Sequence, residues 1–473
     1  MKFPAILVVL ALTVPANLKA QSTVLSGGTL IDGTGGPAIG NSNVVIENGR
    51  ILCVGPATDC EIPEDFDVVD VSGRFITPGL IDAHVHFSQT GWIDGRPDGL
   101  TAPDVYPYSE TTAENRDNPH RWHRSYLCNG ITGVFDVGGH PWTTALPAAA
   151  ENDPTAVHVR AAGPLITHAS VPALNLDEEH YTFLPMGTSE EVQNSVAAVV
   201  EMGSSAVKVW YLRPRPADRE HLDARLMEIG ALAEQAGLDL IVHATSLREA
   251  KMALRAGAKL LVHSVQDTLV DQEFLDLMAR NGTTYAPTLV VGRNWSRAMA
   301  SIMLNRPHEI DDPNSCVDPG TVAKIGNTEI LQDYLPERMR SVEAALRRVE
   351  RSGNVGIMME NLRRVHAAGL YIATATDAGN PFTLHGPSIY NEMEAMQAVG
   401  ISATDVIVMS TKMGAAIMNR LNDIGTLEPG KIADLIILTE NPLEDVRAFR
   451  GVTHVMRMGQ LYRQTELSYT TAN

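Results

Sequence analysis

Short apolar runs alternate with helical patterns through the middle of the chain. The intervening segments are rich in Ala, Leu, Glu and Arg, and they predict connecting helices at residues 190–202, 221–237, 246–257 and 271–281. The apolar runs are typical of strands, which end near the following residues: His86, Asp136, Arg160, Lys208, His243, His263, Thr288 and Asp377. Eight alternations of strand and helix predict an α/β fold with a (β/α)8 TIM barrel over residues 79–423.

Both ends of the chain carry short strand patterns instead. Residues 22–78 are broken into strands by Gly, Asn, Asp and Pro, and Asn48-Gly49 is a strong hairpin turn. A similar pattern follows residue 424, with Ala-Asp-Leu-Ile-Ile-Leu as its clearest strand. Neither piece can bury much apolar area alone. We therefore predict that residues 21–78 and 424–473 build one small β-sandwich domain from both chain ends.

A long insertion separates the last two predicted barrel strands. It covers residues 289–370 and is predicted to be largely helical over residues 328–368. A segment of this length over the active face of a barrel is often a lid or a specificity element. A packed helical elaboration is the alternative.

The first residues have the pattern of a secretory leader. Lys2 precedes an apolar run over residues 3–14, and Leu18-Lys19-Ala20 before Gln21 resembles a cleavage site. We expect residues 1–20 to be a signal peptide and the mature protein to be periplasmic or secreted. The alternative is an uncleaved anchor at a lipid surface. No other stretch is long enough to cross a bilayer, so stable membrane insertion is not expected.

Four cysteines bear on the same question. Cys53 and Cys60 flank a turn-rich segment, which makes a small disulfide-closed hairpin plausible in an exported protein. Cys128 and Cys316 would then remain, and nothing in the sequence brings them together. Free buried thiols are the alternative for all four.

The charge of the chain narrows its class of partner. The formal net charge is −19, which argues against nucleic acid or an anionic membrane as a partner. A small-molecule or dipeptide substrate is the expected partner, and a homo-oligomer stays open.

Six donor side chains fall at the carboxyl ends of the predicted strands. They are His84, His86, Lys208, His243, His263 and Asp377. The first two histidines are two residues apart, so a strand places both rings on one face. A barrel brings its strand ends together, and imidazoles with a carboxylate and a carboxylated lysine are the donors of a two-metal hydrolytic site.

Charge suggests how these donors divide. One divalent ion, expected to be Zn²⁺, would take His84, His86 and Asp377. The second would take His243 and His263. Lys208 would bridge the two ions.

Lys208 and Asp377 have the special roles in this hypothesis. Burial lowers the pKa of a lysine and favours the neutral amine, which reacts with carbon dioxide to form a carbamate. A metal-bridging hydroxide would then attack the substrate carbonyl, and Asp377 would take its proton and pass it to the leaving nitrogen. Such a site suits hydrolysis of amides, peptides, cyclic imides or esters.

The chain resembles the amidohydrolase superfamily, and the resemblance covers nearly its whole length. Pro-Gly-Leu-Ile-Asp-Ala-His-Val-His at residues 78–86 is similar to the strand-one signature of that superfamily. Gly-Thr-Leu-Glu-Pro-Gly-Lys-Ile-Ala-Asp-Leu-Ile-Ile-Leu at residues 425–438 is similar to its C-terminal return to the small domain. The most similar members are imidazolonepropionase-like and prolidase-like. Those with a strand-four lysine hold two zinc ions bridged by carboxylated lysine, which implies the same role for Lys208.

The resemblance also implies roles for three further residues. Some prolidase-like members polarise the scissile carbonyl with a histidine after strand two and a tyrosine after the strand-four lysine, and His140 and Tyr211 match those places. A solvent-capped loop histidine and plain packing at the barrel rim are the alternatives. His385 follows strand eight and could bind substrate. The sequence departs from the family where Glu-His-Gly is replaced by Val-His-Ser around His263.

These observations indicate an exported metal-dependent hydrolase of carbon–nitrogen bonds. An Xaa-Pro or Xaa-basic dipeptidase is one candidate, and a cyclic amide hydrolase of the imidazolonepropionase or hydantoinase kind is the alternative. Deaminase members usually lack the strand-four lysine. A catalytically silent barrel scaffold is the alternative outside enzymes. A substrate α-carboxylate would need a cation, for which Arg160, Arg213 and Arg215 are candidates.

Overall fold

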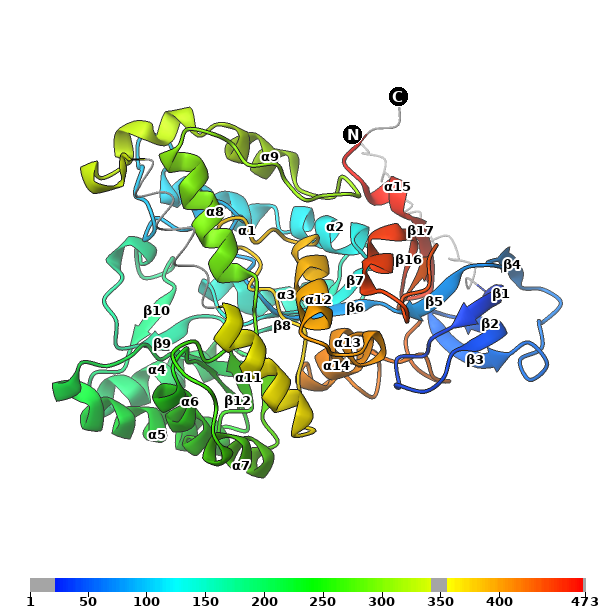
Figure 1. Cartoon of the computed structure of the whole chain (residues 1–473), viewed down its shortest axis with the longest axis horizontal. Coiled ribbons are helices and arrows are strands. Elements are labelled where there is room, and N and C mark those ends of the chain that lie inside the picture. The colour runs from blue at the N-terminus through cyan, green and yellow to red at the C-terminus, as the bar shows by residue number, and fades with distance from the viewer. Residues whose placement is uncertain (1–21, 342–354, 471–473) are drawn as a thin grey trace, which may run out of the picture.

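The computed structural model describes residues 22–341 and 355–470. The predicted signal peptide lies outside the described residues, as does part of the predicted helical insertion. Figure 1 shows a small β domain beside a larger α/β body.

Strands from both chain ends form the small domain, as predicted. Its strands are β1 (Thr23–Leu30), β2 (Ile39–Glu47), β3 (Arg50–Pro56), β4 (Asp67–Asp70), β5 (Phe75–Pro78), β15 (Leu435–Leu438), β16 (Val452–Arg457) and β17 (Gln460–Arg463). They form one eight-stranded sheet in the order β17-β16-β15-β5-β1-β2-β3, with β4 paired to β1. The antiparallel pair β5–β15 joins the two chain ends. The pairing thus gives a single sheet where we expected the two sheets of a sandwich.

The α/β body is built on parallel strands. One sheet has the order β6-β7-β8 and the other the order β10-β9-β11-β12-β13-β14. Their bounds are β6 (Leu80–Val85), β7 (Ile131–Asp136), β8 (His158–Ala161), β9 (Leu165–Thr167), β10 (Phe183–Pro185), β11 (Ala206–Trp210), β12 (Asp239–His243), β13 (Leu260–Val262) and β14 (Thr284–Ala286). The strand pairing therefore gives an α/β body with two parallel sheets, and it does not record one closed barrel.

Residues 371–378 run between the two parallel sheets. The amide of Tyr285 in β14 donates to the carbonyl of Tyr371 at 2.9 Å, and the amide of Ala83 in β6 donates to the carbonyl of Thr374 at 3.0 Å. The amide of Asp377 then donates to the carbonyl of His84 at 2.8 Å. This segment therefore brings Asp377 beside the end of β6.

Helices connect the strands and cover them. They are α1 (Tyr108–Asp117), α2 (His120–Cys128), α3 (Leu146–Ala150), α4 (Ser189–Glu201), α5 (Arg219–Gln235), α6 (Leu247–Arg255), α7 (Gln272–Asn281), α8 (Val291–Met303), α9 (Pro319–Gly326), α11 (Val355–Ala367), α12 (Ser388–Ala398), α13 (Ala403–Ser410), α14 (Lys412–Ile417) and α15 (Gln464–Leu467). The four predicted connecting helices are confirmed as α4 to α7, with bounds that differ by no more than two residues.

The helix α4 illustrates why the sequence forms these elements. Thr188 accepts a hydrogen bond from the amide of Glu191, and the Glu191 side chain accepts one from the amide of Thr188, a reciprocal capping box. Val192, Val196 and Val199 lie on one face of the helix and are buried in the core. The cap starts the helix, and the apolar face sets which side packs on the strands.

Both disulfides form. Cys53 bonds to Cys60, and Cys128, at the end of α2, bonds to Cys316, which precedes α9. The alternative of free thiols is therefore wrong for all four cysteines. A cross-link over 188 residues constrains the unfolded chain more than the hairpin bond does.

Among the described residues, no helix is both long enough and apolar enough to span a bilayer.

Candidate metal centre

The six predicted donors meet in one cavity. His84 lies in β6, and His86 directly follows this strand. Lys208 lies in β11, His243 in β12, His263 directly after β13, and Asp377 in the segment of residues 371–378. All six line a cavity of about 230 Å³. The sequence places them far apart, and the parallel strand ends bring them together.

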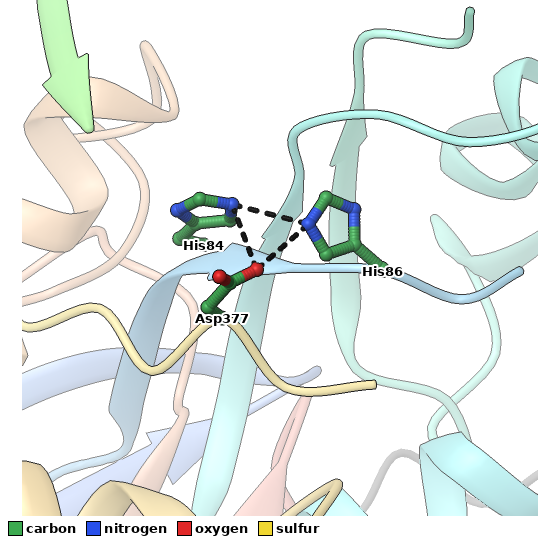
Figure 2. A group of neighbouring side chains, drawn as sticks. All are labelled: His84, His86 and Asp377. Carbon is green, nitrogen blue, oxygen red and sulfur yellow. Dashed lines mark hydrogen bonds and ion pairs between the residues drawn. The ribbon is translucent and has the colours of Figure 1, made fainter. Parts of the chain in front are cut away.

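Three of the donors form a tight group. The Nε2 atoms of His84 and His86 lie 3.2 and 2.9 Å from Oδ1 of Asp377. The two Nε2 atoms are 3.2 Å apart. Figure 2 shows the three side chains pointing at one another from two segments of the chain. Ligand atoms that each lie about 2.0–2.2 Å from one zinc ion have this kind of separation, so the group fits a divalent ion.

Hydrogen bonds behind the rings orient them for that task. The Nδ1 atom of His86 lies 2.6 Å from the carbonyl oxygen of Gly138, which can only accept, so Nδ1 carries the proton. A neutral ring then presents the lone pair of Nε2 to the group. The Nδ1 atom of His263 lies 2.7 Å from Oγ1 of Thr288, which favours the same arrangement. Such partners are typical of metal-binding histidines.

The remaining donors lie beside this group. The rings of His243 and His263 have centroids 4.4 Å apart, and those of His84 and His263 are 5.2 Å apart. Lys208 is 1% exposed, and burial lowers its pKa to about 7, although Asp377 and Asp136 partly oppose the shift. A substantial share of neutral amine is therefore present near neutral pH.

Asp377 stays ionised in this setting. Burial alone would raise its pKa, but the neighbouring His86, His263 and Lys208 hold the pKa below its usual value. The backbone also marks the site, because Asp377, His263 and Thr288 have φ angles of 66°, 74° and 45°. Left-handed φ angles cost energy in residues with side chains and cluster at functional sites.

Two buried carboxyl groups support the first histidine pair. Asp82 accepts from the hydroxyl of Thr376 at 2.5 Å and from the amide of His84 at 3.2 Å, and burial raises its pKa to about 7. Asp136 accepts from the amides of Phe87 and Gly138, and burial raises its pKa to about 6. We did not predict either role. Asp82 stands two residues before His84 in the sequence, and this spacing is the feature from which its role could have been predicted.

The structure places three other predicted residues outside the cavity lining. His140 is buried, and its Nε2 lies 3.1 Å from the hydroxyl of Tyr108, which does line the cavity. Tyr211 donates to Oδ1 of Asp223 at 2.5 Å, toward α5. His385 is likewise not a lining residue. Tyr108 therefore lines the cavity where we expected His140 to do so.

His385 is fixed by aromatic neighbours. Its ring stacks on Trp122 with centroids 4.2 Å apart. Its Nδ1 lies 2.6 Å from the hydroxyl of Tyr126, and its Nε2 lies 2.9 Å from the carbonyl of Gln89. Both ring nitrogens are engaged within the protein, so His385 supports the wall near Gln89 without reaching the cavity.

The candidate cations for a carboxylate also lie elsewhere. Arg160 pairs with Asp239, and Arg213 and Arg215 pair with acidic side chains on the surface. The arginine that lines the cavity is Arg96, in the loop after β6. It pairs with Asp98, and its guanidinium lies 4.9 Å from the ring centroid of Trp295. Nothing in the spacing of the sequence singles out Arg96.

Apolar and aromatic side chains form much of the remaining wall. Phe183 and Trp210 stack with centroids 5.1 Å apart. Val291, Gly292 and Trp295 line the cavity from α8. The insertion therefore contributes to the substrate wall, which favours its role as a specificity element. The helical pattern predicted at residues 328–368 did not include α8.

A family model matches most of the sequence. The model of the amidohydrolase family matches residues 75–462. The chain belongs to the amidohydrolase family. It is therefore a metal-dependent hydrolase of carbon–nitrogen bonds, and the family and its structures imply a TIM barrel with a small domain.

Individual relatives are distant but cover most of the chain. Ochratoxinase of Aspergillus niger is 24% identical over 96% of this chain and 89% of its own length. Imidazolonepropionase of Geobacillus kaustophilus is 23% identical over 88% of each chain. Among solved structures, an Xaa-Pro dipeptidase with bound methionine matches 93% of this chain and 100% of its own, with 23% identity and a TM-score of 0.70. The solved structure supports the fold, and the family match confirms the resemblance to amidohydrolases.

Proposed function

We propose that this amidohydrolase is an exported enzyme that binds two divalent ions, with Zn²⁺ as the expected metal. Its proposed substrates are compact amides such as dipeptides or N-acyl amino acids. The observation that carries the proposal is the meeting of six donors in one cavity. His84, His86 and Asp377 would hold one ion, and His243 and His263 the other. Six donors exceed the need of one tetrahedral site.

In this proposal Lys208 would supply an anionic ligand to the metal site. Its neutral amine would attack the carbon of carbon dioxide, so that an N–C bond forms while one C=O π bond opens onto oxygen, and the nitrogen would then release a proton to water to leave a carbamate. The carbamate carries a negative charge that two cations stabilise, whereas a buried ammonium would repel them. The pKa of about 7 for Lys208 makes the reactive amine accessible.

Asp377 acts as the proton carrier. When bound, divalent ions would acidify a water molecule and polarise the substrate carbonyl. The ionised carboxylate of Asp377 takes a proton from the attacking water and delivers it to the leaving nitrogen. Tyr108 lines the cavity and would hydrogen-bond the substrate there. The carboxyl ends of the parallel strands, together with residues 371–378, would arrange these groups as in a barrel.

The cavity favours a small substrate with an anionic end. Its volume of about 230 Å³ is below the range of about 300–1,000 Å³ that is usual for drug-sized ligands. Arg96 offers a cation for a carboxylate, and Phe183 with Trp210 offers an apolar wall. The same volume also suits a cyclic amide. The similarity to an imidazolonepropionase supports a cyclic amide hydrolase as the second candidate function.

Export is supported by the leader pattern and by both disulfides. Disulfides persist in oxidising compartments, and the described chain has two of them. Periplasmic or secreted localisation is therefore part of the proposal.

A hydrolysis screen tests the proposed function. Zinc-loaded protein is offered dipeptides, N-acyl amino acids and cyclic amides, and the released amine is measured. Each acyclic substrate is paired with its C-terminal amide, which removes the carboxylate. We expect turnover of compact substrates with a free carboxylate. Turnover of cyclic amides alone would favour the second candidate, and no turnover of any amide would contradict both.

A further inference from the structure

A side chain that no part of the proposed mechanism uses lies against Asp377. Asn380 is 3% exposed and lines the cavity. Its Nδ2 donates to Oδ1 of Asp377 at 2.7 Å and to the backbone carbonyl of the same residue at 3.1 Å. Asn380 therefore contacts the carboxylate and also closes the turn that holds Asp377 in its left-handed conformation.

Two donors fix the orientation of this amide. The Oδ1 atom of Asn380 accepts from Nη1 of Arg96 and from Nε1 of Trp295, the latter at 3.0 Å. Guanidinium and indole nitrogens only donate hydrogen bonds, so the oxygen of the amide must face them. The NH₂ group must then face Asp377. A flipped amide would place NH₂ against two donors and its oxygen against a carboxylate.

The two oxygen atoms of Asp377 have different surroundings as a result. Oδ1 receives the Asn380 hydrogen bond and lies 2.9 and 3.2 Å from Nε2 of His86 and His84. Oδ2 lies on the side of His263, at 4.0 Å from its Nδ1. Rotation of the carboxylate would exchange the two atoms and lose the hydrogen bond from Asn380.

We propose that Asn380 is a positioning residue that assigns separate tasks to the two oxygen atoms of Asp377. Oδ1 serves the metal ion shared with His84 and His86, and Oδ2 is left to accept the proton. Arg96 and Trp295 set Asn380, and because both also line the cavity, the substrate wall and the proton acceptor share one hydrogen-bonded network. The proton-accepting part of this inference rests on the proposed function, and the metal-binding part does not.

The experiment compares three variants by zinc affinity and by steady-state kinetics. Asn380→Ala removes the network, and Trp295→Phe keeps an aromatic ring but deletes one donor to Asn380. Asn294→Ala is the matched control, because Asn294 is a buried asparagine of α8 that donates to Thr383 instead. Zinc affinity is measured with Zn²⁺ alone by competition with a chelator, so that this readout needs no substrate.

We expect Asn380→Ala to weaken one zinc site and to lower kcat, each by about 10- to 100-fold, with KM nearly unchanged, as for other side chains that orient metal ligands. For Trp295→Phe we expect a smaller loss of zinc affinity, about 3- to 10-fold, because one donor remains. The control should match the unchanged protein in both readouts.

Unchanged zinc affinity in Asn380→Ala would overturn the positioning role. A raised KM with unchanged kcat would also overturn it, because Asn380 would then act on the substrate directly. If Asn380→Ala does not fold, unchanged zinc affinity in Trp295→Phe overturns the inference. If the unchanged protein hydrolyses no amide, the proposed function fails, while the zinc titrations still decide the role of Asn380.

Discussion

The hydroxyl of Tyr211 donates a 2.5 Å hydrogen bond to Asp223, and Tyr211 is not a lining residue of the cavity. Tyr108 lines the cavity instead, with His140 behind it. We expect Tyr211→Phe to leave kcat/KM within about threefold and to cost about 1 kcal/mol of stability, the usual scale for one hydrogen bond. Tyr108→Phe should lower kcat/KM about tenfold or more, which is the kinetic scale of one lost contact to the reacting group. Steady-state assays and thermal unfolding of both variants provide the comparison.

A reversed ranking of the two tyrosines would contradict the assignment. It would show that Tyr211 turns toward the substrate in the working enzyme.

Lys208→Ala should lose one of the two metal ions and most activity, because the bridging anion is gone. A short carboxylic acid such as propionate should restore part of both, since it can replace the carbamate in the space that the side chain leaves. Metal analysis and activity with increasing propionate measure this. Lys259→Ala is the control, because the Lys259 ammonium binds the carbonyl of Asn281 at the surface. Full metal content in Lys208→Ala would make Lys208 a core lysine only.

Asp377→Asn should keep the fold and much of the metal but lose turnover by about 10²-fold or more, the scale of a lost general base. The amide oxygen can still bind an ion, yet the amide cannot carry a proton. Circular dichroism, metal analysis and kcat separate these effects. A kcat within about tenfold of the unchanged enzyme would require another proton acceptor.

The sequence predicted the donors better than the wall around them. Donors at strand ends are predictable because parallel strands align their carboxyl ends. This alignment brings His84 and Asp377 together although nearly 300 residues separate them in the sequence. Arg96 and Trp295 could not be found in this way. They come from a loop and an inserted helix, whose paths depend on tertiary packing and not on a repeating pattern.

The predicted roles of Tyr211 and His385 show the same limit. Their positions along the chain matched the resemblance, but a side chain turns toward whichever partner its neighbours offer. Asp223 accepts a hydrogen bond from the Tyr211 hydroxyl, and the His385 ring stacks on Trp122. The β-sandwich was expected from strand content alone, whereas the pairing of β5 with β15 merges the strands into one sheet.

Stability should depend on pH through Glu392, which is fully buried and accepts from the amides of Leu289 and Val290. Burial raises its pKa to about 8 from a usual value of 4.5. The folded protein therefore binds the proton more tightly than the unfolded chain does. The resulting stability is complete below pH 4.5 and is lost as the pH rises to about 8, by up to about 1.4 kcal/mol per pH unit.

Chemical unfolding of metal-free protein between pH 5 and 9, at about unit steps, measures this dependence. Glu392→Gln cannot ionise and should make the decline less steep, while Asp82 and Asp136, whose pKa values burial also raises, still contribute to it. An equally steep decline in Glu392→Gln would assign the pH dependence to other groups.

Export makes a prediction about the purified protein. We expect the mature chain to begin near Gln21 and to show no reactive thiol after denaturation without reductant, because all four cysteines are paired. N-terminal sequencing and a thiol count provide the measurement. Four reactive thiols with Met1 retained would place the enzyme in a reducing compartment.

The number of metal ions per chain tests the central claim most directly. Elemental analysis of protein purified without chelator, combined with activity during stepwise addition of Zn²⁺, relates metal content to turnover. The six-donor site predicts that activity rises until two ions are bound per chain. Full activity at one ion per chain, with no further increase on addition of zinc, would contradict the two-metal account.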